Sequence, residues 1–203
     1  MFSVVAVSGS PTVPSRTSGV ADYVLADLAL AGASVRHVRV RDLPADALVC
    51  ADTANASVAQ AMAAVEQADG VVLATPVYQA AYSGLLKLFL DLLPKFGLAG
   101  KAVLPVGVAG SDRYALALDV AFGPVLQALG PRHVVTGCCL LTRQLRWAGG
   151  GILLDADAEL TVADGLAKFR AVLPAAQSPP AQSPPAQSPA LAKPYHLHLK
   201  KAW

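Results

Sequence analysis

Charged residues are scarce in this chain of 203 residues, at 15%, whereas apolar residues make up 54%. This composition excludes an intrinsically disordered protein, because disorder requires low hydrophobicity and high charge. Aromatic residues are also few, at 6%, while Val, Leu and Ala are abundant. Such a composition is typical of a parallel sheet that helices cover on both faces.

An excess of charge of either sign is missing too, since the net charge is only +2. Segment 174–203 carries three lysines and no acid, so the chain without it has a net charge of −1. A domain this close to neutrality lacks the basic surface that binds phosphate backbones. We therefore predict no binding to nucleic acid.

Cysteine is rare, and Cys50, Cys138 and Cys139 lack the spacing of a metal site. An odd number of cysteines without such spacing is typical of reduced thiols in a cytosolic protein. The N-terminal segment lacks the basic residues of a signal peptide. No uninterrupted apolar run approaches the ~20 residues of a membrane span. These absences predict a cytoplasmic protein with neither a metal site nor a membrane anchor.

Short apolar runs alternate with segments of helical periodicity along residues 2–173. Strands are expected at 2–7, 35–40, 70–75, 102–108 and 134–141, and helices at about 18–31, from 57, from 83, at 111–129 and at 157–173. Pro76 is expected to end the third strand, and 42–55 to form a loop. Strict alternation indicates right-handed crossovers around a parallel sheet. The predicted fold class is α/β: a flavodoxin-like three-layer sandwich with a five-stranded parallel sheet of order 2-1-3-4-5.

The last thirty residues differ in composition from the rest. Ala-Gln-Ser-Pro-Pro occurs at 176–180 and again at 181–185, and a third copy begins at Ala186. A repeat of this kind cannot bury a core. We therefore predict a flavodoxin-like domain at 1–173 and a Pro/Ser/Gln-rich low-complexity tail at 174–203. The tail either has no role or docks through its amphipathic end.

Hydroxyl groups are concentrated in the loop after the first strand, where the next helix begins. The candidate ligands there are Ser10, Arg16, Thr17 and Ser18. A helix N-terminus presents unpaired N–H groups, and hydroxyls with one arginine complete a phosphate site. The loop lacks both the P-loop ending and the G-x-G-x-x-G fingerprint, which favours a monophosphate such as that of FMN. The alternative is an ordinary polar turn with an N-cap serine.

Two further loops, after the third and fourth strands, are expected at the same edge of the sheet. Their candidate cofactor-binding residues are Pro76, Val77, Tyr78, Ala109, Gly110 and Ser111. The first three can run along a planar ring, or the tyrosines of this loop can fill a subunit contact. The small residues of the other loop allow close approach to a flat ligand. Arg113 either meets a second phosphate, such as that of NADPH, or is an ordinary surface arginine.

No catalytic constellation of side chains is visible, so a cofactor would carry the chemistry. The expected third helix is apolar around its whole circumference. Its apolar residues are Leu85, Leu86, Leu88, Phe89, Leu90, Leu92 and Leu93. A helix that is apolar all round is buried on both sides, and in a domain of this size the second side indicates a partner subunit. A homo-oligomer is therefore expected.

A series of motifs follows one order between residues 3 and 140. The motifs are Gly9-Ser-Pro11, Pro14-Ser-Arg-Thr-Ser18, Ala74-Thr-Pro-Val-Tyr78, Ala81-Tyr-Ser-Gly84, Asp91-Leu-Leu-Pro94 and Pro124-Val-Leu126. Together they resemble the NADPH-dependent FMN reductase family. The most similar branch consists of the flavin reductases that supply reduced FMN to alkanesulfonate monooxygenases.

The resemblance implies an NAD(P)H:FMN oxidoreductase, with FMN and NADPH or NADH as its cofactors. It implies that Ser10, Arg16, Thr17 and Ser18 hold the FMN phosphate, that Pro76, Val77 and Tyr78 line the isoalloxazine ring, and that Ala109, Gly110 and Ser111 border its other edge. It also implies a homodimer or homotetramer, formed through the helix after Gly84, and a partner monooxygenase.

The chain departs from this family at three positions. Val108-Ala109-Gly110 stands where Thr-Gly-Gly is usual, and Tyr114 where the branch has a histidine. Val120 stands where the most similar relatives insert an aromatic residue that is linked to release of flavin. Two alternatives therefore stay open: a quinone reductase with tightly bound FMN, and a non-enzymatic flavin-binding electron carrier.

Overall fold

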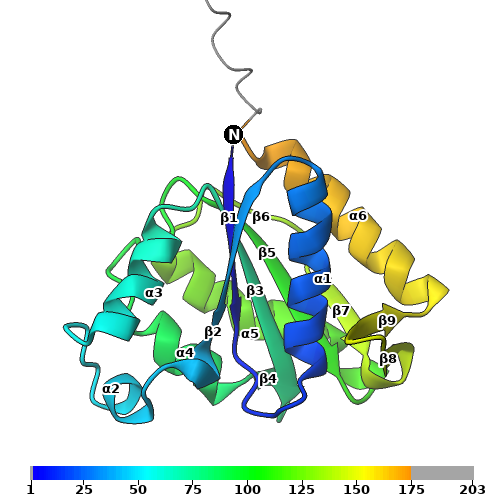
Figure 1. Ribbon diagram of the computed structural model, residues 1–203, viewed down its shortest axis with the longest axis horizontal. Coiled ribbons are helices and arrows are strands. Elements are labelled where there is room, and N and C mark those ends of the chain that lie inside the picture. Colours follow the sequence, from blue (N-terminus) through cyan, green and yellow to red (C-terminus); the bar gives the residue numbers. More distant parts are fainter. Residues whose placement is uncertain (1, 175–203) are drawn as a thin grey trace, which may run out of the picture.

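A parallel sheet forms the centre of the protein (Figure 1). The computed structural model describes residues 2–174, apart from the side chains of 115–117 and 119. The parallel strands are β1 (Ser3–Ser8), β2 (Ser34–Arg39), β3 (Gly70–Tyr78), β5 (Ala102–Ala109), β6 (His133–Val134) and β7 (Cys138–Leu141). They follow the order β2-β1-β3-β5, with β6 and β7 both paired to β5. The predicted flavodoxin-like α/β fold class is confirmed.

Helices cover both faces of this sheet (Figure 1). One face carries α1 (Arg16–Leu30) and α6 (Ala156–Val172), and the other carries α3 (Ala56–Glu66), α4 (Gly84–Leu90) and α5 (Ala115–Leu129). Because successive strand residues point to opposite faces, β1 contributes Val5 and Val7 to one core and Val4 and Ala6 to the other. Two buried faces on every central strand account for the high apolar content.

The predicted number of five strands is wrong, because the sheet has seven. The expected fifth strand is divided into β6 and β7. Ala102 pairs with His133, but Val106 pairs with Cys138, so the second segment holds one residue more than its partner strand. An extra residue of this kind is a β-bulge, which interrupts pairing and re-aims the chain.

The seventh strand arises because Pro76 does not end β3, contrary to expectation. The strand continues to Tyr78 and turns back into the short antiparallel β4 (Ala81–Tyr82). Proline is tolerated at a sheet edge, where its missing N–H breaks no ladder. Pairing of β3 with β1 ends at Ala74, so Pro76 lies beyond the part of β3 that β1 covers.

Several smaller elements were not expected. Segment 42–55, predicted as a loop, contains α2 (Ala45–Val49), and the 3-10 turn η1 (Val40–Asp42) precedes it. An antiparallel hairpin, β8 (Leu145–Ala148) and β9 (Gly151–Leu154), follows the 3-10 turn η3 (Thr142–Gln144). Another 3-10 turn, η2 (Asp112–Tyr114), forms the beginning of the helix expected at 111–129. The hairpin packs beside α1, where a Cβ on Gly19 would lie 3.1 Å from Ile152 Cβ.

The predicted tail falls outside the described residues, so its composition-based prediction stays a prediction. Residue 174, the first residue of the predicted tail, is the last that the structure describes. Between residues 2 and 174, no helix combines the length and apolar character needed to cross a membrane.

Candidate functional site

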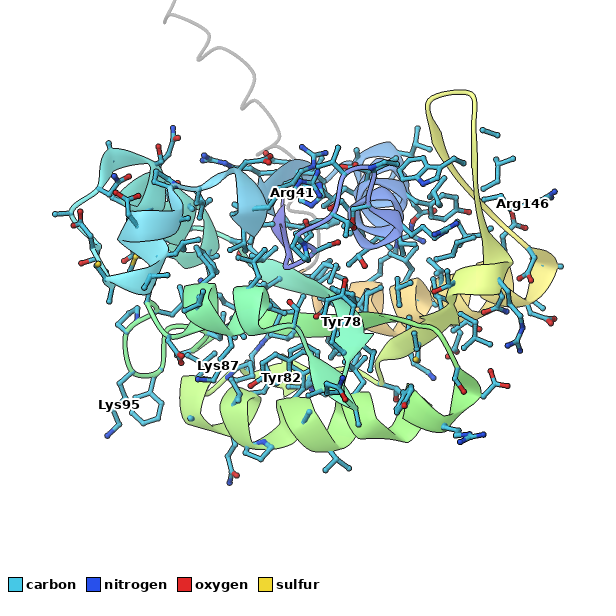
Figure 2. The ribbon with its side chains drawn as sticks, turned by 90° about the horizontal axis from the view of Figure 1, so that it is seen from below. Arg41, Tyr78, Tyr82, Lys87, Lys95 and Arg146 are labelled. Atoms are coloured by element: carbon cyan, nitrogen blue, oxygen red, sulfur yellow. The ribbon has the colours of Figure 1, made fainter. Side chains whose placement is uncertain are left out.

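The carboxyl ends of the parallel strands gather several loops at one end of the sheet. Figure 2 looks onto this end, with Arg41 after β2 and Tyr78 at the end of β3. The loop from β1 to α1 lies between these two positions, because β1 pairs with both β2 and β3. The end of β5 follows on the other side of β3, where Pro76 pairs with Val108. The predicted site loops are therefore neighbours.

The loop after β1 delivers buried hydroxyl groups to the N-terminus of α1. Ser15 is the N-cap residue, and its side chain accepts a hydrogen bond from the backbone N–H of Ser18 at 3.1 Å. Ser10, Thr17 and Ser18 are each at most 4% exposed. The first turn of α1 contains no acidic residue. Unpaired N–H groups, buried hydroxyls and the positive end of the helix dipole together favour an anion here.

Arg16, the fourth residue predicted at this loop, points elsewhere. Its exposed side chain donates a hydrogen bond from Nε to the carbonyl oxygen of Leu145, 3.2 Å away in hairpin β8–β9. The guanidinium group that does contact the loop belongs to Arg41, which was not predicted. Its Nη1 donates to the carbonyl oxygen of Thr12 at 3.0 Å and to Ser18 Oγ at 3.1 Å.

Arg41 is one end of a chain of hydrogen bonds that leads through Ser18, Ser8 and His37 to Asp22. Ser18 Oγ lies 3.1 Å from Ser8 Oγ, which lies 2.8 Å from His37 Nε2. His37 Nδ1 lies 2.7 Å from a carboxylate oxygen of Asp22. The imidazole side chain is only 7% exposed. His37 was also missed, since it was expected to lie outside the site loops.

The protonation state of His37 determines which group donates and which accepts in each hydrogen bond of this chain. Burial lowers the pKa of His37, more than Asp22 raises it, and Arg39 and Arg41 lower it further. A neutral imidazole has one donor and one acceptor. Because the carboxylate of Asp22 only accepts, Nδ1 donates to it and Nε2 accepts from Ser8. The Ser8 oxygen is then free to accept the proton of Ser18, whose oxygen accepts from Arg41.

A buried serine fixes the distance between the loops after β1 and β3. Ser83 Oγ donates to the carbonyl oxygen of Gly9 at 2.5 Å and accepts from the backbone N–H of Leu86 at 3.1 Å. The backbone N–H of Ser83 donates to the side chain of Thr75 at 2.8 Å. Gly9 is required at this junction, because a Cβ there would lie 2.4 Å from Leu86 Cβ.

The turn between β3 and β4 presents Tyr78 at the surface. Pro76 and Val77 are buried, whereas Tyr78 is 46% exposed. The two turn residues, Gln79 and Ala80, have φ angles of 47° and 60°. A left-handed conformation at both positions is characteristic of a type I′ turn, which normally requires Asn or Gly. Backbone strain of this kind is concentrated at functional sites.

The end of β5 is open and lined by small residues. Ala109 is buried, and its carbonyl oxygen accepts a hydrogen bond from Thr142 Oγ1 at 3.1 Å. Gly110 is exposed, and a Cβ built on it meets no atom within 4 Å. Ser111 follows on the same loop, and Arg113 is exposed. This loop leaves room for a flat ligand.

These features fit a flavin mononucleotide. The N-terminus of α1 and Arg41 offer donors to a phosphate, and Nε of Arg41 is buried without a hydrogen-bond partner. Tyr78 is exposed at the end of β3, and a Cβ on Gly110 at the end of β5 would meet no atom within 4 Å. Among the described residues, no group of three His, Cys, Asp or Glu side chains could hold a metal ion. The geometry therefore supports binding of an organic phosphate cofactor.

Comparison with known proteins gives consistent findings. The model of the family described as NADPH-dependent FMN reductase matches residues 2–144. An FMN reductase (NADPH) of Escherichia coli strain K12 is 39% identical over 134 residues, which cover 66% of this chain and 70% of that protein. An FMN reductase (NADPH) of Pseudomonas putida is 40% identical over 147 residues, which cover 72% of this chain and 75% of that protein. A relative named NADH-dependent FMN reductase SfnF, from Pseudomonas putida, is 36% identical over 126 residues, which cover 60% of this chain and 68% of that protein.

Solved structures agree with these matches. The apo form of the NADH:FMN oxidoreductase EmoB superimposes with a TM-score of 0.80 at 40% sequence identity, covering 87% of this chain and 92% of that one. An oxidoreductase from Corynebacterium diphtheriae gives a TM-score of 0.71 at 27% identity, covering 85% and 97%. The relatives named for a reductant include both NADPH and NADH enzymes.

Proposed function

The chain belongs to the NADPH-dependent FMN reductase family, and from this premise we propose that it reduces FMN with NADPH or NADH. The observation that carries the proposal is the N-terminus of α1. Buried hydroxyls surround it, its first turn has no acid, and a guanidinium contacts its loop. This combination suits a phosphate monoester.

The proposed roles follow the three loops. The phosphate is held by Ser10, Arg16, Thr17 and Ser18, one edge of the ring by Pro76, Val77 and Tyr78, and the other edge by Ala109, Gly110 and Ser111. Arg16 is exposed, so it can turn from Leu145 toward the phosphate. Bound FMN supplies the hydride-accepting chemistry, while the side chains orient the ring and exclude water from its buried edge.

A second candidate is a reductase that keeps FMN bound and passes electrons to a quinone or a protein partner. One observation favours it. Helix α5 runs as an uninterrupted α-helix, and Val120 on it is 75% exposed. The resemblance associates an aromatic insertion at this position with release of flavin. Without that insertion, flavin is a fixed cofactor rather than a released substrate.

Three further features belong to the proposal. A cytoplasmic location is supported by the reductant, since NAD(P)H is an intracellular metabolite. A homodimer or homotetramer is supported by Leu88 on α4, which is 36% exposed although apolar. If reduced FMN leaves the protein, a flavin-dependent monooxygenase is a suitable acceptor.

The test is an anaerobic titration. Purified protein is mixed with NADPH, or in parallel with NADH, and a large excess of free FMN, and loss of the flavin absorbance is followed. Bleaching of many equivalents of FMN per chain supports the flavin reductase. Bleaching of about one equivalent supports the fixed-cofactor candidate. No bleaching above a protein-free control with either nucleotide refutes both.

A further inference from the structure

We propose that Arg41, just after β2, binds the phosphate of the flavin directly. This inference rests on the proposed function, because it names a further ligand in the same site. Arg41 lies in η1, outside the three loops from which the other candidate ligands come. The neighbouring position of β2 and β1 in the sheet brings it to the phosphate loop (Figure 2).

The guanidinium is held against both sides of that loop. Nη1 donates to the carbonyl oxygen of Thr12, in the middle of the loop, and to Ser18 Oγ, in the first turn of α1. These bonds place a full positive charge beside the N–H groups at the start of the helix. A helix N-terminus carries only about half a charge, so a phosphate dianion requires an additional cation. Arg16 instead bonds to hairpin β8–β9.

The hydrogen-bonding state of Arg41 also indicates a missing acceptor. Its side chain is only 16% exposed, and the buried Nε has no hydrogen-bond partner. The nearest carboxylate oxygen, on Asp42, is 3.5 Å from Nε. Arg39 provides the contrast, since its Nη2 donates to both carboxylate oxygens of Asp22 at 2.9 Å. A largely buried guanidinium that is not fully hydrogen-bonded is unfavourable, and a phosphate supplies further acceptors to this guanidinium.

Ser18 strengthens the assignment. Its backbone N–H donates to Ser15 Oγ, and its hydroxyl group lies between Ser8 and Arg41. With its oxygen accepting from Arg41 and its proton directed to Ser8, Ser18 positions the guanidinium, so its share in holding the phosphate is through Arg41. An arginine can contact two phosphate oxygens at once through its planar fork.

A phosphate monoester occurs both in FMN and at the 2′-position of NADPH. We assign the FMN phosphate to Arg41, because Thr12 and Ser18 belong to the loop proposed to hold it. The test compares dissociation constants of FMN and riboflavin, which lacks the phosphate, for wild type, Arg41→Gln and Arg41→Lys. Arg39→Gln is the matched control, because it removes an arginine two residues away that is already paired with Asp22.

Arg41→Gln is expected to weaken FMN binding by roughly tenfold or more, with riboflavin binding unchanged. Arg41→Lys retains the charge but lacks the planar guanidinium, so its FMN affinity is expected to lie between those of wild type and Arg41→Gln. Arg39→Gln leaves both affinities at the wild-type level. Added salt weakens FMN binding to wild type more than to Arg41→Gln.

Three outcomes overturn the inference. An equal loss of FMN and riboflavin binding in both Arg41 variants shows that the residue only supports the fold of the site. Unchanged FMN binding shows that it makes no contact. A raised KM for NADPH but not NADH, with FMN unaffected, assigns it to the nucleotide. If wild type binds neither FMN nor riboflavin, the proposed function itself is wrong. This outcome differs from the three above, in which wild type binds flavin and only the role of Arg41 is wrong.

Discussion

The loops after β1 and β3 can approach each other only because residue 9 is a glycine and has no Cβ. A Cβ there would lie 2.4 Å from Leu86 Cβ and 2.9 Å from Leu86 Cα. We expect Gly9→Ala to lower the free energy of unfolding by about 1–3 kcal/mol, because overpacking forces the backbone apart. Gly84→Ala is the control, since a Cβ there meets nothing within 4 Å. Urea denaturation measures both, and equal stability of the two variants would contradict the prediction.

His37 predicts a specific dependence of stability on pH. Burial lowers its pKa in the folded protein below the ordinary value of 6.5, so the unfolded chain binds more protons than the folded one as the pH falls. The contribution is constant above pH 6.5, and stability is lost as the pH falls from there toward the lowered pKa. Asp22 opposes the shift, while Arg39 and Arg41 add to it.

The measurement compares unfolding free energies at about pH 7.5 and about pH 5.5. Wild type should lose more stability over this interval than His37→Gln, which has no imidazole to protonate. His133→Gln is the matched control, because it replaces a histidine exposed on β6 and leaves His37 and its hydrogen bonds in place. If His37→Gln and wild type lose the same amount, His37 does not titrate in the way proposed.

Which site residues the sequence could predict depends on where their signal lies. Ser10, Thr17 and Ser18 were predictable, because a cluster of hydroxyls at the start of a helix has a direct physical meaning. The structure places them together at the N-terminus of α1. Arg41 and His37 were missed, because they lie on β2 and just after it, outside the three loops that carry the sequence signals. The predicted order 2-1-3 already placed the end of β2 beside the phosphate loop, so the signal was available.

Among the elements, the β3–β4 hairpin carries the clearest strain. Ala80 has a φ of 60°, a conformation that costs a residue with a Cβ about 1–2 kcal/mol. We expect Ala80→Gly to raise the free energy of unfolding by about 0.5–1 kcal/mol, because glycine loses only roughly 0.5–1 kcal/mol through its additional flexibility. The control Ala81→Gly, one residue later in β4, should instead destabilise the protein. Thermal or urea unfolding measures the stability of both variants. A lower free energy of unfolding in Ala80→Gly as well as in Ala81→Gly would show that the turn is not strained.

The elements themselves were largely predictable, with failures at short and irregular segments. Long apolar runs such as 102–108 gave the central strands almost to the residue. The bulge between β6 and β7 was invisible, because its cause is a register shift against β5 that only tertiary pairing reveals. Hairpin β8–β9 had a usable signal. Gly149 and Gly150 form its two-residue turn, with φ angles of 58° and 84°, and Gly-Gly between short strands favours such a turn.

The arrangement of α4 and α5 bears on assembly of the protein. α4 was expected to be apolar and buried all round, but in the single chain Leu88 is 36% exposed. A groove of about 380 Å³ lies between the end of α4, the segment after it and α5. Its lining includes the apolar Leu90, Leu93, Pro124 and Val125 and the charged Lys87, Asp91 and Lys95. Burying this surface against a second copy would remove apolar area from water. The surface therefore supports the proposed homo-oligomer.

Leu88→Glu tests this interface. A carboxylate on α4 would have to be buried without a partner in the oligomer, so we expect the variant to dissociate toward a monomer while each chain stays folded. Leu160→Glu is the matched control, because Leu160 is 71% exposed on α6, on the opposite face of the sheet. Light scattering after size-exclusion chromatography gives the mass of each form. An oligomeric wild type that Leu88→Glu leaves intact would place the interface elsewhere, whereas a monomeric wild type would mean that Leu88 faces solvent in the active protein.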